Sequence, residues 1–316
     1  MMKTKTSPVL ELKHTILETI GNTPLIRLRN IVADLPQTME IWVKIEGANP
    51  GGSVKDRPAL QMVLDGIENG ELTSDKIILD STSGNTGIAL ALIGSIIKMP
   101  VTLCLPANVS TERKAKILAY GAEPVYTSPM EGSDGAIVKA REMYENEPEK
   151  YFKPDQYSNP SNPKAHFLTT GPEIWKQTSG RITHFVSTIG TSGTLMGTGK
   201  YLKGENPQVK VYAAEPDDAF HGLEGLKHME SSLVPAIYDP SWLDGIVSIP
   251  TEPSYELVRK LAREDGIFAG QSSGGAVWAA IEMAHRLMEA GQKEAVIVTV
   301  LPDSGDKYYS KGLWDY

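Results

Sequence analysis

The sequence has very little cysteine. Cys104 is the only one among 316 residues, so no disulfide can form within the chain. The absence of disulfides is typical of a reducing compartment, and we expect a cytoplasmic protein. Cys104 lies in the apolar run 101–105, where a buried structural thiol is expected rather than a nucleophile. Residues 1–6 include charges but lead into no apolar segment, so no secretory signal is expected.

Long apolar runs and an excess of basic residues are also missing. The longest apolar run, 88–97, ends before Lys98 and Pro100 and is too short to span a bilayer, so we expect no membrane segment. The formal net charge is -8, and no basic stripe with interleaved aromatic residues occurs, which argues against nucleic-acid binding. The six histidines form no His-Glu-x-x-His motif and have no cysteine partners, so no metal site is expected.

What the chain does contain is a repeated alternation of strand and helix patterns. Short apolar runs predict strands at residues 41–45, 77–80, 101–105, 123–126, 184–187, 209–214 and 295–300. Apolar residues at helical spacing predict helices between them, among them 60–67, 112–120, 135–146, 256–264 and 276–289. This alternation predicts an α/β fold with parallel sheets covered on both faces. The length allows two domains, and the loop-rich stretch 153–163 is a candidate crossing between them.

Lys55 lies where the 41–45 strand gives way to a helix, shortly after a turn at Pro50, Gly51 and Gly52. The free N–H groups and positive dipole end of a helix N-terminus disfavour a second positive charge. A lysine in that place is biased toward the neutral amine, which Schiff-base chemistry needs. From this stretch alone, a surface lysine in a capped turn is an equally good interpretation.

Four loops rich in Gly, Ser, Thr and Asn follow strands or begin helices. In open α/β sheets, ligands collect beyond the carboxyl ends of the strands. The 190–194 loop, Gly-Thr-Ser-Gly-Thr, offers free N–H groups and hydroxyl donors that suit a phosphate. It matches neither a Walker A loop nor the dinucleotide fingerprint, and a plain turn remains the alternative. The 83–87 loop has a similar pattern and could hold a second anion, such as a substrate carboxylate.

A lysine that can form an imine, together with a separate phosphate loop, suggests pyridoxal phosphate. Six motifs then resemble, in order along nearly the whole chain, those of the cysteine synthase family (O-acetylserine/O-phosphoserine sulfhydrylases), which are fold type II pyridoxal-phosphate enzymes. These are Gly21-Asn22-Thr23-Pro24-Leu25, Asn49-Pro50-Gly51-Gly52-Ser53-Val54-Lys55-Asp56-Arg57, Thr82-Ser83-Gly84-Asn85-Thr86-Gly87, Gly190-Thr191-Ser192-Gly193-Thr194, Gly270-Gln271-Ser272-Ser273-Gly274 and Leu301-Pro302-Asp303-Ser304-Gly305.

The resemblance implies a tryptophan synthase β-like fold of two domains, each with a mostly parallel twisted sheet flanked by helices. A smaller, mobile substrate-binding domain is expected at residues 48–158, with the first residues of the chain as a further candidate part. Residues 1–47 and 159–316 are then the larger domain, which holds the cofactor phosphate. The active site is expected between the two domains, and a homodimer is implied.

The resemblance also implies roles for single residues. Lys55 carries the cofactor as a Schiff base, Asn85 bonds its ring hydroxyl, and Ser272 faces its pyridine nitrogen. The cofactor phosphate is held by Gly190, Thr191, Ser192, Gly193 and Thr194. The substrate carboxylate is held by Thr82, Ser83, Thr86 and Gln156. Two residues depart from the family pattern: Ser192 stands where many relatives have glycine, and Gln271 where isoleucine is common.

The implied activity is a β-replacement that forms L-cysteine. A serine hydroxyl beside the pyridine nitrogen does not favour protonation of the ring, so the cofactor is a weaker electron sink and β-elimination is favoured over transamination. The expected substrates are an O-activated L-serine (O-acetyl-L-serine or O-phospho-L-serine) and sulfide or another sulfur donor. Lys55 acts as general base, and an α-aminoacrylate intermediate accepts the sulfur.

The leaving group stays open at this stage. The stretch 222–229 resembles the loop in mycobacterial-type relatives where an arginine recognises O-phosphoserine, and Lys227 falls at that place. A lysine can serve a phosphate as a point charge but lacks the bidentate fork of arginine. A solvated loop lysine is the alternative.

Three other functions compete with cysteine synthesis. Cystathionine β-synthase, which uses serine and homocysteine, is the nearest, because residues 155–163 also resemble that group. Threonine or serine dehydratases share the fold but match the Lys55 motif less well. A non-catalytic module that keeps the phosphate loops is disfavoured by the intact Lys55, Asn85 and Ser272.

Overall fold

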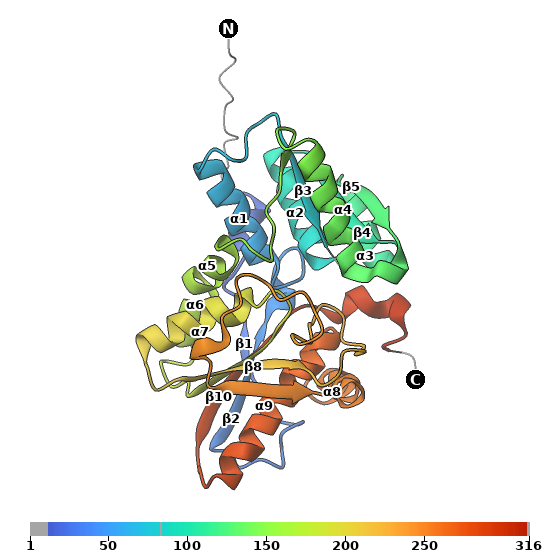
Figure 1. Ribbon diagram of the computed structural model, residues 1–316. Coiled ribbons are helices and arrows are strands. Elements are labelled where there is room, and N and C mark those ends of the chain that lie inside the picture. Colours follow the sequence, from blue (N-terminus) through green and yellow to red (C-terminus); the bar gives the residue numbers. More distant parts are fainter. Residues whose placement is uncertain (1–11, 83, 315–316) are drawn as a thin grey trace.

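The computed structural model describes residues 12–82 and 84–314, and its ribbon shows two α/β parts, one above the other in the view of Figure 1. The strands are β1 (Leu25–Arg27), β2 (Met39–Ile45), β3 (Ile77–Ser81), β4 (Val101–Pro106), β5 (Glu123–Thr127), β6 (Tyr151–Phe152), β7 (His184–Thr188), β8 (Lys210–Pro216), β9 (Gly245–Ile249) and β10 (Ala295–Leu301). The α-helices are α1 (Asp56–Glu68), α2 (Asn85–Ile97), α3 (Thr111–Ala119), α4 (Gly132–Asn146), α5 (Ser161–Leu168), α6 (Thr170–Gln177), α7 (Gly193–Glu205), α8 (Thr251–Glu264) and α9 (Gln271–Glu289).

The larger sheet has six strands in the order β1-β2-β10-β7-β8-β9, and only β1 runs antiparallel. The central strand β10 is buried at all seven residues because helices cover the sheet on both faces. A parallel strand in that position is apolar throughout, as the sequence 295–301 is. The carboxyl ends of β2, β10 and β7 therefore lie at the same edge of the sheet and deliver the loops that follow them to one place.

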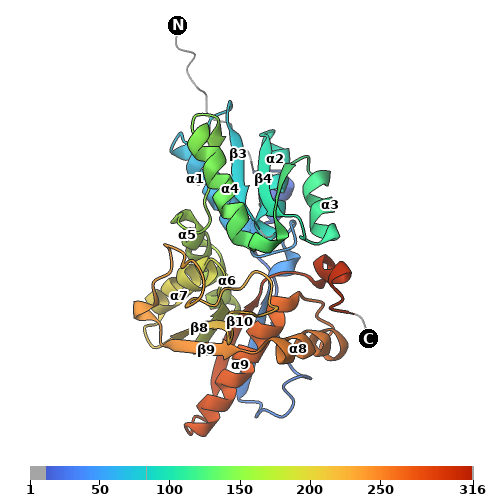
Figure 2. The same ribbon diagram turned by 45° about the vertical axis from the view of Figure 1, so that its right-hand side comes forward.

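The smaller sheet has four parallel strands in the order β5-β4-β3-β6. All six residues of β4 are buried, and Cys104 within it is a buried free thiol, as the sequence predicts. Figure 2 shows α2 and α4 on this part of the molecule, above α5, α6 and α7 of the larger part. The α/β class and the two mostly parallel sheets predicted from the sequence are confirmed.

Several elements differ from the sequence expectation, among them α8 and α9, which each begin five residues before the predicted start. Helix α9 begins at Gln271, five residues before the predicted 276, although Ser and Gly are weak helix formers. Its first turns are buried, and a Cβ at Gly274 would press against the Ser254 carbonyl, so close packing outweighs propensity there. The strand β9 is absent from the strands predicted from the sequence, because this edge strand is half exposed and has no continuous apolar run.

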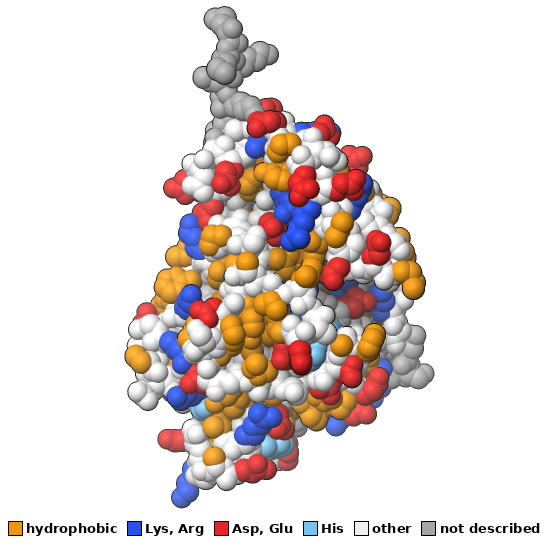
Figure 3. Space-filling model, viewed as in Figure 1, with side chains coloured by type: hydrophobic (Ala, Val, Ile, Leu, Met, Phe, Trp, Pro, Cys, Tyr) orange, Lys and Arg blue, Asp and Glu red, His pale blue; other side chains and the backbone are white. Residues whose placement is uncertain are grey.

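On the face shown in Figure 3, acidic and basic side chains are interspersed rather than separated into single-sign patches. A mixed surface of this kind produces no strong field toward an extended polyanion on that face. Within residues 12–82 and 84–314, no helix has both the length and the apolar character needed to cross a bilayer.

Candidate active site

One cavity brings together most of the residues that the sequence motifs point to. It lies where the carboxyl ends of β7 and β10 meet the turn before α1 and the start of α2. Among its lining residues are Lys55, Asn85, Gly190, Thr191, Ser192, Gly193, Thr194 and Ser272. From Lys55 to Ser272 these residues span more than 200 positions of the sequence, and the topology of the two sheets brings them into one place.

Lys55 is the residue before the first turn of α1, and its backbone N–H donates to Ser53 Oγ at 3.2 Å. Gly52, at φ +84°, makes the turn that leads to it. Burial lowers the pKa of the Lys55 amine, and the nearby Asp303 opposes this in part. The bias toward a neutral amine therefore comes chiefly from burial, whereas the sequence argument attributed it to the helix terminus.

The 190–194 loop joins β7 to α7 and is closed tightly by neighbouring backbone and side chains. A Cβ on Gly190 would collide with the carbonyl oxygen of Gly225, and one on Gly193 with the Asn162 amide. Ser192 has φ +71°, a left-handed conformation that favours glycine. The buried Ser192 hydroxyl has no hydrogen-bond partner in the described part of the chain. An anion in this loop would satisfy it.

His166 supports this loop from behind. Its Nε2 lies 3.2 Å from Thr194 Oγ1 and its Nδ1 lies 2.8 Å from Thr170 Oγ1. Burial lowers the pKa of His166 to about 3, so the ring is neutral and offers one donor and one acceptor. The sequence search for histidine motifs missed this residue, because its role depends on a contact across 28 residues.

The Asn85 side chain is held on both sides by residues of the C-terminal segment. Its Nδ2 donates to Asp303 Oδ2 at 2.7 Å, and its Oδ1 accepts from Lys307 Nζ at 2.9 Å. Tyr308 Oη also donates to Asp303 Oδ2 at 2.9 Å. The sequence argument quoted Asp303 within a motif without a role, and it missed Lys307 and Tyr308.

Ser272 lies in the first turn of α9 and is buried against the cavity. The neighbouring Gln271 is also buried, and its Oε1 accepts from the Glu224 backbone N–H at 3.4 Å. Gln271 thus forms a polar link to the 222–229 loop.

A second cavity of about 280 Å³ opens from Lys55 and Asn85 toward the surface. Thr86 and Gln156 line it, and Thr86 Oγ1 donates to Gln156 Oε1 at 2.8 Å. Thr82 has a local structural role, because its Oγ1 accepts from the backbone N–H groups of Gly84 at 2.9 Å and Gly87 at 3.2 Å. Ser83, the fourth residue assigned to a substrate carboxylate, lies outside the described residues.

Lys227 lines the same second cavity, together with Asp134 and Tyr157. Its backbone N–H donates to the Ile189 carbonyl at 2.9 Å, and its Nζ lies 5.4 Å from the centre of the Tyr157 ring. Burial lowers the pKa of the Lys227 amine, and Asp134 opposes this. The side chain therefore lies in the cavity rather than in open solvent.

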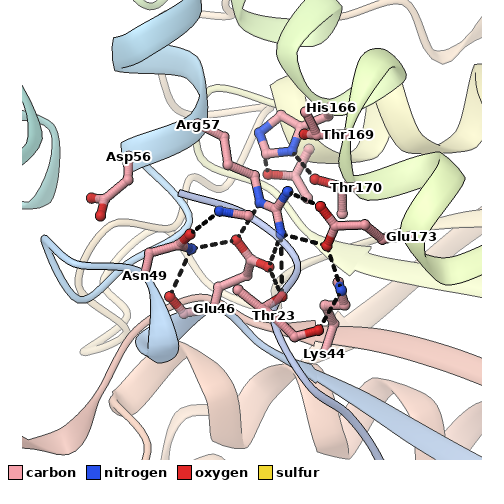
Figure 4. A network of polar contacts seen from close by, with 12 residues as sticks. Thr23, Lys44, Glu46, Asn49, Asp56, Arg57, His166, Thr169, Thr170 and Glu173 are labelled. Atoms are coloured by element: carbon pink, nitrogen blue, oxygen red, sulfur yellow. Dashed lines mark hydrogen bonds and ion pairs between the residues drawn. The ribbon is translucent and has the colours of Figure 1, made fainter. Parts of the chain in front are cut away.

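A buried ionic network lies beneath the Lys55 turn (Figure 4). Arg57 Nε donates to Glu46 Oε2 at 2.7 Å, and Arg57 Nη1 donates to Glu173 Oε1 at 2.7 Å. Lys44 Nζ pairs with Glu173 Oε2 at 2.6 Å. The network joins β2, α1 and α6, so it fixes the turn that carries Lys55 to the larger sheet.

Comparison with known proteins gives this geometry a family. The model of the family described as "Pyridoxal-phosphate dependent enzyme" matches residues 16–303, and the chain belongs to that family. Among its relatives, the cysteine synthase of Aquifex aeolicus is 53% identical over 308 residues, which are 97% of this chain and 94% of the relative. The cysteine synthase B of Pseudomonas aeruginosa is 42% identical over 301 residues, covering 95% of this chain and 97% of the relative.

Solved structures give the same result for the fold. The cysteine synthase of Entamoeba histolytica has a TM-score of 0.90 at 35% identity and covers 98% of this chain and 93% of its own. An O-acetylserine dependent cystathionine β-synthase from Helicobacter pylori has a TM-score of 0.88 at 35% identity, covering 96% of this chain and all of its own. The predicted fold type II pyridoxal-phosphate enzyme is therefore confirmed.

The residues present fit this cofactor. A buried lysine amine lies in the same cavity as a loop that offers N–H groups and an unsatisfied hydroxyl for a phosphate. Ser272 and Asn85 provide polar groups along the same cavity.

Proposed function

We propose that this chain forms L-cysteine by β-replacement, from an O-activated L-serine and sulfide or another sulfur donor. The observation that carries the proposal is the similarity to cysteine synthases over almost the entire chain, at 53% identity to the relative from Aquifex aeolicus. The placement of Lys55, Ser272 and the 190–194 loop in one cavity supports it.

Bound pyridoxal phosphate supplies an aldehyde carbon that links to an amine and a ring that accepts electrons from the substrate Cα. Lys55 provides the amine and, once free, takes the Cα proton as general base, a role that its lowered pKa favours. Ser272 faces the ring nitrogen with a neutral hydroxyl, and the 190–194 loop holds the phosphate. Asn85 donates to the ring hydroxyl.

The substrate carboxylate is proposed to bind at Thr82, Ser83, Thr86 and Gln156. Thr86 and Gln156 line the second cavity beside Lys55, which supports this assignment. A carboxylate there would replace the Thr86–Gln156 hydrogen bond with charge-assisted ones.

A side-by-side assay tests the function. O-acetylserine, O-phosphoserine and serine are each offered with sulfide and with homocysteine, and the products are separated by chromatography. Cysteine formed from an O-activated serine and sulfide supports the proposal. Cystathionine as the main product would instead favour cystathionine β-synthase activity, the second candidate. The similarity to the Helicobacter pylori cystathionine β-synthase supports that candidate.

Lys227 is proposed to contact the leaving group or the incoming donor, because it faces the second cavity. If it recognises a phosphate, Lys227→Ala lowers kcat/KM for O-phosphoserine at least about tenfold more than for O-acetylserine, or about 1.4 kcal/mol of differential binding. Steady-state kinetics with both substrates measure this difference. Lys200→Ala, at an exposed lysine of α7, is the matched control. Equal losses on both substrates would remove phosphate recognition from Lys227.

Three broader properties are proposed alongside the activity. Residues 48–158, which contain the four-stranded sheet, act as the smaller mobile domain and close over the substrate, while residues 1–47 and 159–316 form the larger one. The chain acts as a homodimer in the cytoplasm. Light scattering of the purified protein measures whether it is a dimer. Small-angle X-ray scattering with and without substrate measures the domain closure.

A further inference from the structure

Lys307 is a fully buried lysine that the proposed chemistry does not use. It lies in the 3-10 helix η5 (Gly305–Lys311), which follows β10 and the 302–304 loop. Its Nζ donates to the Gly52 carbonyl oxygen at 2.6 Å and to Asn85 Oδ1 at 2.9 Å. A buried ammonium requires such partners, because leaving water without them is costly. The Lys307 side chain therefore has a defined position at the wall of the active site.

Lys307 and Asp303 together determine the orientation of the Asn85 amide. Lysine is only a donor and an ionised carboxylate is only an acceptor. The amide oxygen must then face Lys307, and the amide nitrogen must face Asp303. The structure has this orientation: Asn85 Oδ1 lies 2.9 Å from Lys307 Nζ, and Asn85 Nδ2 lies 2.7 Å from Asp303 Oδ2. A flipped amide would place the Asn85 oxygen against the Asp303 carboxylate and the Asn85 N–H groups against the Lys307 ammonium. One N–H hydrogen of Asn85 is used by Asp303, and the second can be donated into the cavity that Asn85 lines.

The same lysine contacts the turn that carries Lys55. Gly52, whose carbonyl accepts from Lys307, is three residues before Lys55. The turn is also tied to the end of β10, because the Val54 N–H donates to the Pro302 carbonyl at 2.8 Å and Ser53 bridges to Asp303. Lys307 thus joins three segments at one atom: the Lys55 turn, the start of α2 and the C-terminal segment.

The charges around Lys307 support its cationic form. Asp303 and Asp56 attract its positive charge, whereas Lys116 and Arg113 oppose it. Burial lowers the pKa of Lys307 to about 8, so the ammonium is the main form at neutral pH. Electrostatic attraction to the amide oxygen polarises Asn85 and makes its N–H a stronger donor.

We propose that Lys307 is a positioning residue for the cofactor: it holds and polarises the Asn85 amide so that one N–H faces the cofactor ring. It acts through Asn85 and not by touching the substrate. The inference rests on the role of Asn85 given under the proposed function, and it adds a residue to which no role has been assigned.

The test compares Lys307→Met with wild type in the full-length protein. The variant keeps the length of the side chain but removes the charge and the donor. We expect the dissociation constant for pyridoxal phosphate, measured by fluorescence titration, to rise about tenfold, and the visible absorption band of the bound cofactor to move. Lys307→Arg keeps a charged donor and is expected to recover most of both properties. Lys150→Met, which removes an exposed ion pair to Glu147, is the control and should match wild type.

A double-mutant cycle with Asn85→Ala separates positioning from general stability. If Lys307 acts through Asn85, Lys307→Met has little further effect on cofactor binding in the Asn85→Ala background. Equal effects in both backgrounds would overturn the proposal, as would a folded Lys307→Met with the wild-type dissociation constant and spectrum. If Asn85→Ala itself binds and absorbs like wild type, the assignment of Asn85 fails first.

Folding is checked by thermal unfolding of each variant. If Lys307→Met does not fold, Lys307→Gln replaces it, because glutamine keeps an N–H donor without the charge. The expected signature is then a shifted absorption band with a smaller loss of binding. Failure of both variants to fold would make Lys307 a stability residue and overturn the proposal.

Discussion

Lys55→Ala is expected to lower kcat for cysteine formation by roughly 10³-fold or more while leaving the fold intact. The residue supplies both the amine for the cofactor and the general base, and no other lysine lines the cavity of the 190–194 loop among the described residues. Borohydride reduction of the wild-type protein loaded with pyridoxal phosphate should attach the cofactor to Lys55. Peptide mass spectrometry measures that attachment.

The control for this experiment is Lys260→Ala, at an exposed lysine of α8. It should keep wild-type turnover and wild-type labelling. Labelling of a different lysine in the wild-type protein, or full turnover by Lys55→Ala, contradicts the assignment of Lys55. Circular dichroism of the variant separates a loss of chemistry from a loss of structure.

Arg57→Met is expected to destabilise the protein by about 3–5 kcal/mol, because it leaves the fully buried Glu46 carboxylate without its ion-pair partner and leaves Glu173 with Lys44 alone. Arg57 is buried and donates to Glu46 at 2.7 and 2.8 Å and to Glu173 at 2.7 and 2.9 Å. Burial acts to raise the pKa of Glu46, but Arg57, the Thr23 hydrogen bond and Lys44 together outweigh it, and the pKa lies below its usual value. Urea unfolding followed by circular dichroism measures the loss.

Arg181→Met is the matched control for Arg57, because it removes an exposed arginine that pairs with Glu40 at 3.2 Å. Pairs of this exposed kind contribute about 1 kcal/mol or less. An unfolding midpoint of Arg57→Met close to that of Arg181→Met would show that the buried network does not stabilise the Lys55 turn. The large difference between the two variants is therefore the informative result.

Much of the fold could be predicted from the sequence, because buried strands and helices require apolar residues in runs or at regular spacing. The strands 41–45, 77–80 and 295–300 lie within β2, β3 and β10, where apolar runs match strands covered on both faces. The beginning of α9 and the strand β9 could not be read in this way. The beginning of α9 depends on close packing of small residues, and β9 is half exposed at a sheet edge.

The residues of the candidate site likewise fall into those that could be recognised from the sequence and those that could not. Lys55 and the 190–194 loop could be selected from local residue type and spacing at strand-to-helix turns, whereas Asn85 and Ser272 were selected by the resemblance of their motifs to those of the family. His166, Lys307 and the Arg57 network have no such local pattern, since each acts through partners that are distant in the chain.

The sequence by itself determined the α/β class, the family motifs and the lysine that can carry a cofactor, because these depend on residue type and local spacing. Only the tertiary structure decided which side chains meet at the cavity, why the pKa of Lys55 is lowered, and how Asn85 is oriented. Burial and hydrogen-bond direction are properties of groups brought together by folding, and a linear order of residues does not contain them.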